Sequence, residues 1–223
     1  MKMYLAPFAA GAALLGLAPL LHANELLVNG GFEDEPNYGS GYLNYGSYSV
    51  FIGNEIPGWT IAPGHAATIH NTSTYPTIDG NYSLNTDGEG TFGNNVLIYQ
   101  DFSSLSGSQY NLSFKWETWY LNSGAELEVT VFDTTRNDVL FDGIYPDTAP
   151  SSENVNTTFT GTGDNLRLQI DENPQSFFND NAFIVDDFSV TSSSVPDSTG
   201  LGAELAALLL VGGLARRFLV ARA

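Results

Sequence analysis

Short segments in which apolar and polar residues alternate fill the chain between residues 24 and 191. A β-strand sends successive side chains to opposite faces, so this period of two is typical of strands with one buried and one solvated face. No segment in this range has the 3.6-residue period of an amphipathic helix, and Gly, Pro, Asn and Asp cluster between the alternating segments. The pattern predicts a single all-β domain, a sandwich or a barrel.

Gln109–Tyr120 is the longest of nine or ten expected strands. Its alternation places Trp116 toward the core, together with Trp59 from an earlier segment, and sends Glu117 and Trp119 to the other face. The remaining expected strands are Glu25–Val28, the end of Pro57–Ile61, Ala66–His70, Tyr82–Thr86, Val96–Phe102, Glu126–Asp133, Val155–Thr160, Leu166–Ile170 and Asn181–Thr191.

The last expected strand carries a carboxylate in an apolar pattern. Ile184, Phe188 and Val190 fall on one parity, and Asp186 shares it. A buried carboxylate costs several kcal/mol unless it is paired, hydrogen-bonded or bound to a metal. We expect its partner to lie near the glycine-bearing turn Asn29–Glu33, so that the last strand closes against the start of the domain.

The two ends of the chain differ from the rest. Residues 1–23 have a basic start and an uncharged apolar run, which predicts a secretory signal helix; a retained membrane helix is the alternative. Residues 192–223 contain a flexible serine spacer, an apolar segment at 201–215 that would form a second helix, and a basic end at 216–222. The longest uncharged run there is too short for a permanent span of roughly 20 residues.

This tail resembles the PEP-CTERM class of sorting signals in its VPDSG-like form. The resemblance implies export from a Gram-negative-type bacterium, transient membrane insertion through both ends, processing by an exosortase, and delivery to the cell surface or extracellular matrix. Whether the tail is cleaved or retained stays open. The residues that carry the resemblance are Val195, Pro196, Asp197, Ser198, Arg216 and Arg217.

The charge balance disfavours two classes of binding partner, nucleic acids and anionic lipids. The chain has a formal net charge of −18, and without its two ends it keeps 23 acidic and three basic residues, a net charge of about −20. Such a surface repels nucleic acid and anionic lipid. The chain has no cysteine, which excludes disulfides and thiol chemistry.

Five segments in order resemble the landmarks of the galactose-binding-like jelly rolls. This group includes many carbohydrate-binding modules and related domains of unknown function in exported proteins of bacteria and plants. The resemblance covers most of residues 24–191 and implies a β-sandwich jelly roll of eight or more strands. The segments are Leu26–Glu33, Gly58-Trp59, Gln100, Tyr110–Phe114 and Phe183–Val190.

The same resemblance often implies a structural calcium ion between the turn after the first strand and the last strand. Glu33 and Asp186 match its two carboxylates, and Asp187 is the second choice. Calcium takes six to eight oxygen ligands, and the glycine turn can offer carbonyls. The alternative is that Asp186 accepts hydrogen bonds from backbone N–H groups of the turn.

For carbohydrate binding, the useful features are exposed aromatic side chains beside polar groups, because a ring can stack on the apolar face of a sugar. Trp119 beside Glu117 fits this description. The range Asn37–Asn54 is rich in Tyr, Gly, Ser and Asn, which predicts a loop, and its Tyr45 and Tyr48 could contact a ligand. The alternative is that this loop simply covers Trp119.

Signals for catalysis are weak. His65 and His70 lack the spacing of a zinc site and are expected at the surface or rim. Glu117 could share an outer face with Glu126 or Glu128, as a glycoside hydrolase would need, although solvated acids form such pairs by chance. We therefore expect an exported, non-catalytic domain that binds polysaccharide. The alternatives are a structural biofilm protein without sugar affinity and an acidic polysaccharide hydrolase.

Overall fold

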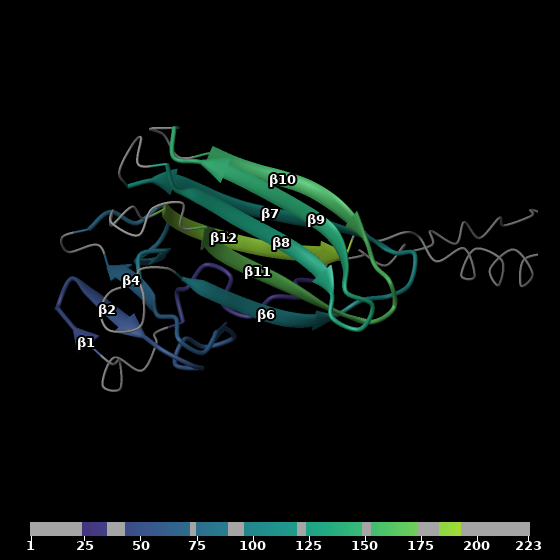
Figure 1. Ribbon diagram of the computed structural model, residues 1–223, viewed down its shortest axis with the longest axis horizontal. Helices are drawn as coiled ribbons and strands as arrows, with labels where there is room; N and C mark the ends of the chain where they lie inside the picture. Colours follow the sequence, from purple (N-terminus) through teal and green to yellow (C-terminus); the bar gives the residue numbers. More distant parts are fainter. Residues whose placement is uncertain are drawn as a thin grey trace, which may run out of the picture.

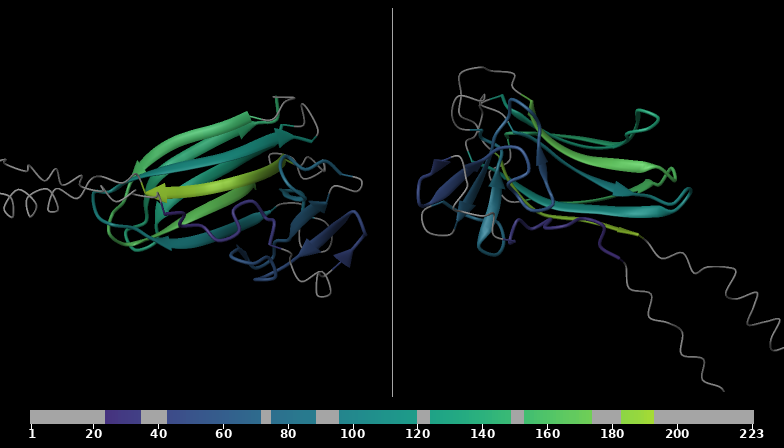
Figure 2. Two further views of the ribbon diagram at one scale, coloured as in Figure 1. Left: turned by 180° about the vertical axis from the view of Figure 1, so that it is seen from behind. Right: turned by 90° about the horizontal axis from the view of Figure 1, so that it is seen from below.

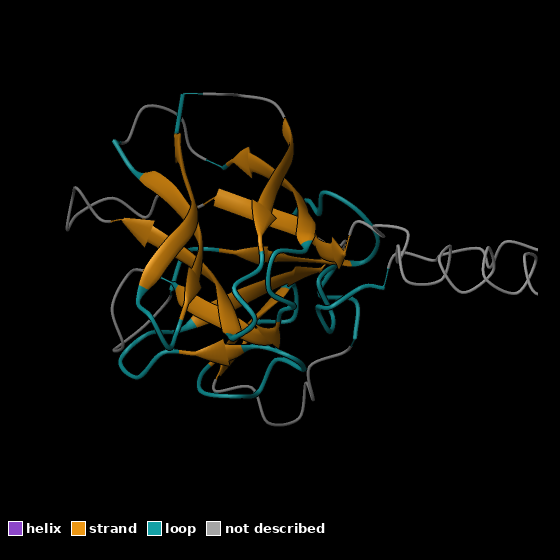
Figure 3. Ribbon diagram, turned by 90° about the vertical axis from the view of Figure 1, so that its right-hand side faces the viewer, coloured by secondary structure: helices purple, strands orange, loops and turns teal. Residues whose placement is uncertain are grey.

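The computed structural model describes residues 24–34, 43–71, 75–88, 96–119, 124–148, 153–173 and 183–192. These residues form strands and loops and contain no helix (Figure 3). No membrane-spanning helix is therefore found among them. The expected signal helix at 1–23 and the sorting helix within 192–223 lie outside the described residues.

Twelve strands in the described part build two antiparallel sheets, which we call sheet A and sheet B. In Figure 1 the strands of sheet B lie in front of β12, β7 and β10 of sheet A. Sheet A has the order β1 (Leu43–Asn44), β2 (Tyr48–Phe51), β4 (Ala67–Asn71), β5 (Tyr82–Asn85), β12 (Phe183–Ser192), β7 (Gln109–Thr118) and β10 (Glu153–Thr160), and sheet B has the order β3 (Thr60–Ile61), β6 (Leu97–Ser103), β11 (Asn165–Asn173), β8 (Glu126–Asp133) and β9 (Asp138–Pro146).

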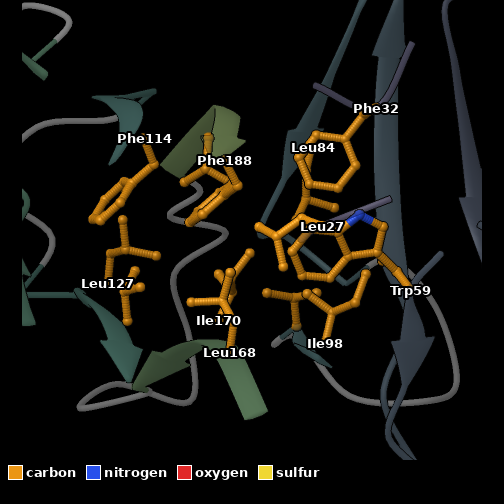
Figure 4. Packing of buried hydrophobic residues seen from close by; sticks show 14 of the residues in the cluster. Leu27, Phe32, Trp59, Leu84, Ile98, Phe114, Leu127, Leu168, Ile170 and Phe188 are labelled. Atoms are coloured by element: carbon orange, nitrogen blue, oxygen red, sulfur yellow. The ribbon is translucent and has the colours of Figure 1, made fainter. Parts of the chain in front are cut away.

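The predicted all-β sandwich is confirmed, and its core lies between the two sheets. Alternate residues of β6, β7, β8 and β11 face this core and are almost fully buried. Figure 4 shows Phe188 between Phe114 and the Phe32–Trp59 pair. Phe188 stacks on Phe114 at 4.9 Å and meets Trp59 edge-on at 5.9 Å. Trp59 and Trp116 are both buried in this core, as predicted.

Three strands were not expected, and one expected strand is absent. β1 and β2 lie inside the range predicted to be loop, because Ser49–Phe51 pairs with β4 despite the surrounding Tyr, Ser and Gly residues. β9 was missed because Asp138, Asp142 and Gly143 interrupt its alternation at the solvated edge of sheet B. Glu25–Val28 forms only an isolated bridge instead of a strand.

The start of the domain does close against its last strand, as predicted. The Leu26 N–H donates to the Val190 carbonyl at 2.9 Å, and the Phe188 N–H donates to the Gly30 carbonyl at 3.0 Å. A Cβ atom at Gly30 would lie 1.8 Å from the Phe188 carbonyl oxygen, so only glycine allows this approach. Figure 2 shows the N-terminal segment alongside β12 when the molecule is seen from below.

Candidate functional site

The direction of Asp186 differs from the prediction because β12 contains a bulge. Val185 before the bulge and Phe188 after it both face the core, although they are three positions apart and regular alternation would put them on opposite faces. Asp187 has a φ of +53°, and the register with β7 shifts at this point. A bulge adds one residue and so reverses the alternation. Asp186 therefore lies opposite Lys115 on the outer face of sheet A, not on the face of Phe188.

Asp186 is nevertheless only 1% exposed, so its predicted burial is confirmed. The Ser83 hydroxyl donates to its Oδ2 at 2.6 Å and the Asp79 N–H at 3.2 Å, while the Asp187 N–H donates to its Oδ1 at 2.7 Å. Burial raises the pKa of Asp186 to about 7, against the opposing effect of these hydrogen bonds. Its donors thus come from β5, from the segment just before β5 and from its own strand, not from the turn Asn29–Glu33.

Glu33 lies in the same corner of the molecule. Its Oε1 accepts hydrogen bonds from the N–H groups of Asn81 at 2.7 Å and Tyr82 at 2.9 Å. A side chain at Gly31 would lie within 4 Å of Glu33, Asp186 and Asp187. The structure therefore brings together the three acids that the sequence assigned to a calcium site.

The surroundings of these acids do not fit a calcium ion. Their oxygens are engaged by N–H and O–H donors, and the Lys115 ammonium contacts Asp187 at 2.6 Å and Asp79 at 2.8 Å. Calcium needs six to eight oxygen ligands. Within the described ranges no three ligating side chains are arranged to hold a metal ion. Lys115 supplies the positive charge here, and calcium binding stays an untested prediction.

A second group of side chains, the aromatic cluster, consists of Tyr45, Tyr48, His70, Tyr75 and Trp119. Tyr45 stacks on Tyr48 at 4.7 Å, and Tyr48 meets Tyr75 edge-on at 5.4 Å. Trp119 lies 5.6 Å from Tyr75 and 5.7 Å from His70. Tyr45 is 52% exposed, the other three large rings are partly exposed, and His70 is 2% exposed. The cluster is therefore a partly solvated aromatic surface with an imidazole at its base.

His70 is held in one orientation by a short polar relay. The Asp87 N–H donates to Asn85 Oδ1 at 2.8 Å, which leaves the Asn85 amide nitrogen facing His70 Nε2 at 2.6 Å. Nε2 must then accept, so the neutral ring carries its proton on Nδ1, which is buried beside the Pro76 backbone. Burial lowers the pKa of His70 to about 4, with a smaller opposing effect from the Pro76 backbone. The expectation that His70 is a surface or rim residue is wrong.

Glu117 borders the aromatic cluster on the outer face of sheet A. It lies opposite Ile184 of β12, and Ile184 lies opposite Asn85 of β5, so the three side chains form one row across the sheet. Burial raises the pKa of the half-buried Glu117 carboxyl. Trp119 follows two residues later and contacts His70, which confirms that it points away from the core.

The two acids suggested as partners of Glu117 are on the far side of the molecule. Leu127 and Val129 face the core from β8, so Glu126 and Glu128 face the outside of sheet B. Glu117 faces the outside of sheet A. Two carboxylates with the sandwich between them cannot flank one glycosidic bond, so the expectation of a shared face is wrong.

Tyr75, His70 and Asn85 join the site although no pattern in the sequence assigned them to it. Tyr75 precedes Pro76 in a loop, and Asn85 ends a short strand. Their importance depends on which strands pair, and only the β2–β4–β5–β12 order brings them beside Trp119. The sorting residues Val195–Ser198, Arg216 and Arg217 lie outside the described residues.

A sequence family described as "Protein of unknown function (DUF642)" matches residues 25–190. The chain belongs to the DUF642 family. The match includes every residue of the aromatic cluster and the group Glu33, Asp79, Lys115, Asp186 and Asp187, which we call the closure corner, so both features lie in the DUF642 domain. A comparison with curated proteins gave no match.

Solved structures similar to this DUF642 chain share its β-sandwich fold at low sequence identity. An arabinose-bound MgGH51 α-L-arabinofuranosidase has a TM-score of 0.50 and 14% identity, over 77% of this chain and 27% of that one. The chain thus spans about a quarter of that enzyme. The CBM22-1 xylan-binding domain of Paenibacillus barcinonensis Xyn10C has a TM-score of 0.45 and 15% identity (62% and 87% covered). TmCBM61, in complex with β-1,4-galactotriose, has a TM-score of 0.43 and 13% identity, over 77% of this chain and 100% of that one.

Proposed function

We propose that this DUF642 domain is a non-catalytic carbohydrate-binding domain and that the aromatic cluster with Glu117 is its binding surface. The observation that carries the proposal is the grouping of Tyr45, Tyr48, Tyr75 and Trp119 over a buried, oriented His70. Aromatic rings that remain partly solvated offer flat apolar surface for the C–H face of a sugar ring.

Polar groups beside the rings support the same proposal. A pocket for a neutral ligand needs a few fixed donors and acceptors among apolar groups. Glu117 provides an acceptor for sugar hydroxyls beside the aromatic rings. Asn85 fixes the imidazole beneath the aromatic rings, so this part of the site is organised before a ligand arrives.

The location of the protein belongs to the same proposal. A signal peptide at 1–23 and a PEP-CTERM-like tail at 192–223 would export the domain through an exosortase-type system to the surface or extracellular matrix of a Gram-negative-type bacterium. The strongly acidic, cysteine-free composition suits such a location. Mass spectrometry of the C-terminus of the surface-located protein tests this part, because an intact Ala223 would contradict processing.

Binding is tested by affinity electrophoresis and calorimetry with a panel of neutral glycans: xylan, β-1,4-galactan and arabinan. We expect at least one to bind and Trp119→Ala to weaken that binding by about tenfold or more, which corresponds to about 1.4 kcal/mol. The matched control is Phe132→Ala, which removes a half-buried ring from the outer face of sheet B. Absence of binding to every glycan, or equal losses in both variants, would contradict the proposal.

A further inference from the structure

We propose that the aromatic cluster is selective for uncharged glycans and excludes acidic polysaccharides such as polyuronates. This inference rests on the proposed carbohydrate binding and adds the class of ligand. The observations that carry it are the pairing of every basic side chain in the domain and the position of Glu117.

Only three lysine or arginine residues occur between residues 24 and 192, and each is held by carboxylates. Lys115 contacts Asp79 and Asp187. Arg136 lies 3.0 Å from Asp164 and 3.7 Å from the buried Asp133. Arg167 forms a two-bond contact with Asp101, at 2.6 and 2.8 Å, and its guanidinium lies 3.6 Å from the centre of the Tyr99 ring.

These cations are also in the wrong places to help an anionic ligand at the aromatic cluster. Arg136 lies in the turn between β8 and β9, and Arg167 faces the outside of sheet B opposite Phe132. Lys115 shares the outer face of sheet A with Glu117, but both neighbouring carboxylates raise its pKa and hold its ammonium at the closure corner. Recruiting it would leave Asp79 and Asp187 without their counter-ion.

Histidine does not replace the missing cation. His70 is the imidazole within the cluster, and because it is buried it stays neutral at any pH well above about 4. The cluster therefore presents no cationic imidazole to a ligand. Binding a carboxylate there would bury a charge beside Glu117 with no compensating positive charge, which is costly.

The negative electrostatic field of the whole domain also disfavours acidic ligands. The domain carries a net charge of about −20. The repulsion between this charge and an anionic ligand acts over about 8 Å at physiological ionic strength, which is farther than the contact distance of an ion pair. An acidic polymer presents many charges to this field at once, whereas a neutral polymer presents none. The two ligand classes should therefore respond differently to salt.

The experiment compares each neutral glycan that binds with its own carboxymethylated derivative, by calorimetry at 20 and 300 mM NaCl. We expect the neutral form to bind equally at both salt concentrations. We expect the charged form to bind at least tenfold more weakly at 20 mM, with a smaller difference at 300 mM. Equal or tighter binding of the charged form at low salt would overturn the selectivity and leave the proposed function standing. Binding of neither form would overturn both.

A variant separates the local acid from the general field. Glu117→Gln should narrow the low-salt difference between the two forms severalfold, because it removes the charge nearest the ligand. The matched control is Glu126→Gln, which makes the same change of net charge on the outer face of sheet B. Identical effects of the two substitutions would show that Glu117 has no local part in the selectivity.

Discussion

The outer face of sheet A contrasts sharply between Lys115, in the second half of β7, and Trp119, which directly follows β7, although the two residues are only four positions apart in the sequence. At the Lys115 end, the acids Asp186, Asp187 and Glu33 all have hydrogen-bonding or ionic partners within the protein. At the Trp119 end, aromatic rings stay partly solvated above the buried imidazole of His70.

This contrast separates stability from binding. A polar network whose members are all satisfied rigidifies the fold and has nothing left to offer a ligand. A partly solvated aromatic ring leaves apolar surface in water in the free protein and becomes useful when a ligand covers it. The closure corner is thus the structural end of this face, and the aromatic cluster is the end available for recognition.

The variant with the largest expected effect destabilises the closure corner and leaves the aromatic cluster intact. Asp186→Ala removes a buried acceptor and leaves the Ser83 hydroxyl and the Asp79 N–H without it. We expect the free energy of unfolding to fall by about 3 kcal/mol in urea titrations. Glycan affinity measured well below the melting temperature should stay unchanged.

The reciprocal variant is Tyr45→Ala, in which the removed ring is about half exposed. It should weaken glycan binding and leave the urea midpoint unchanged within error, since surface substitutions rarely exceed about 0.5 kcal/mol. A large loss of stability in Tyr45→Ala, or a loss of affinity in Asp186→Ala, would show that the two ends are coupled.

Changing the pH sharpens the comparison because the two ends respond with opposite signs. At the closure corner the pKa of Asp186 is raised from 3.8 to about 7, so the folded state binds more protons between these values and stability falls as the pH rises. Glu172, buried under Thr86 with a pKa raised from 4.5 to about 8, acts in the same direction. The pKa of His70 is lowered from 6.5 to about 4, so its contribution to stability is instead lost as the pH falls from 6.5 to about 4.

Above pH 6.5 His70 adds little further stability, so the loss caused by the two buried acids dominates. Urea titrations at pH 6.5 and 8 should therefore show lower stability at pH 8. Glu172→Gln, which keeps the shape of the side chain, should reduce this decrease. A wild-type stability that rises between these two pH values would contradict the assignment.

The smallest expected effect concerns the metal. If Lys115 supplies the charge at the closure corner, thermal melting should give the same midpoint in EDTA and in millimolar calcium. Lys115→Met should lower the midpoint, although less than Asp186→Ala, because the ion pairs are partly solvated. A midpoint that rises with calcium in the wild type would restore the metal site that the sequence suggested.

The fold was largely predictable because most of its strands have one buried and one solvated face. Val96–Phe102 and Glu126–Asp133 alternate cleanly, and both are found as strands of sheet B. β9 alternates poorly because it is an edge strand with little buried surface, so its position depends on pairing with β8. Such pairing is a tertiary effect that a local pattern does not contain.

The positions of the site residues were predictable only where the alternation within a single strand determines the direction of the side chain. The outward direction of Trp119 follows from the alternation of β7 alone. The direction of Asp186 does not follow from β12 alone, because a bulge at Asp187 reverses the pattern. Tyr75 and His70 depend on which loops and strands become neighbours, and no spacing in the sequence records that.

The closure of the first segment on β12 also determines how the domain would carry a load. Glu25 pairs with Thr191 near one end of β12, whereas Ile184, beside the row that leads to the aromatic cluster, lies near the other end. Tension between a tethered terminus and a captured polymer would run lengthwise along this central strand. Hydrogen bonds between strands are perpendicular to that direction, so they would be sheared together instead of being peeled apart singly.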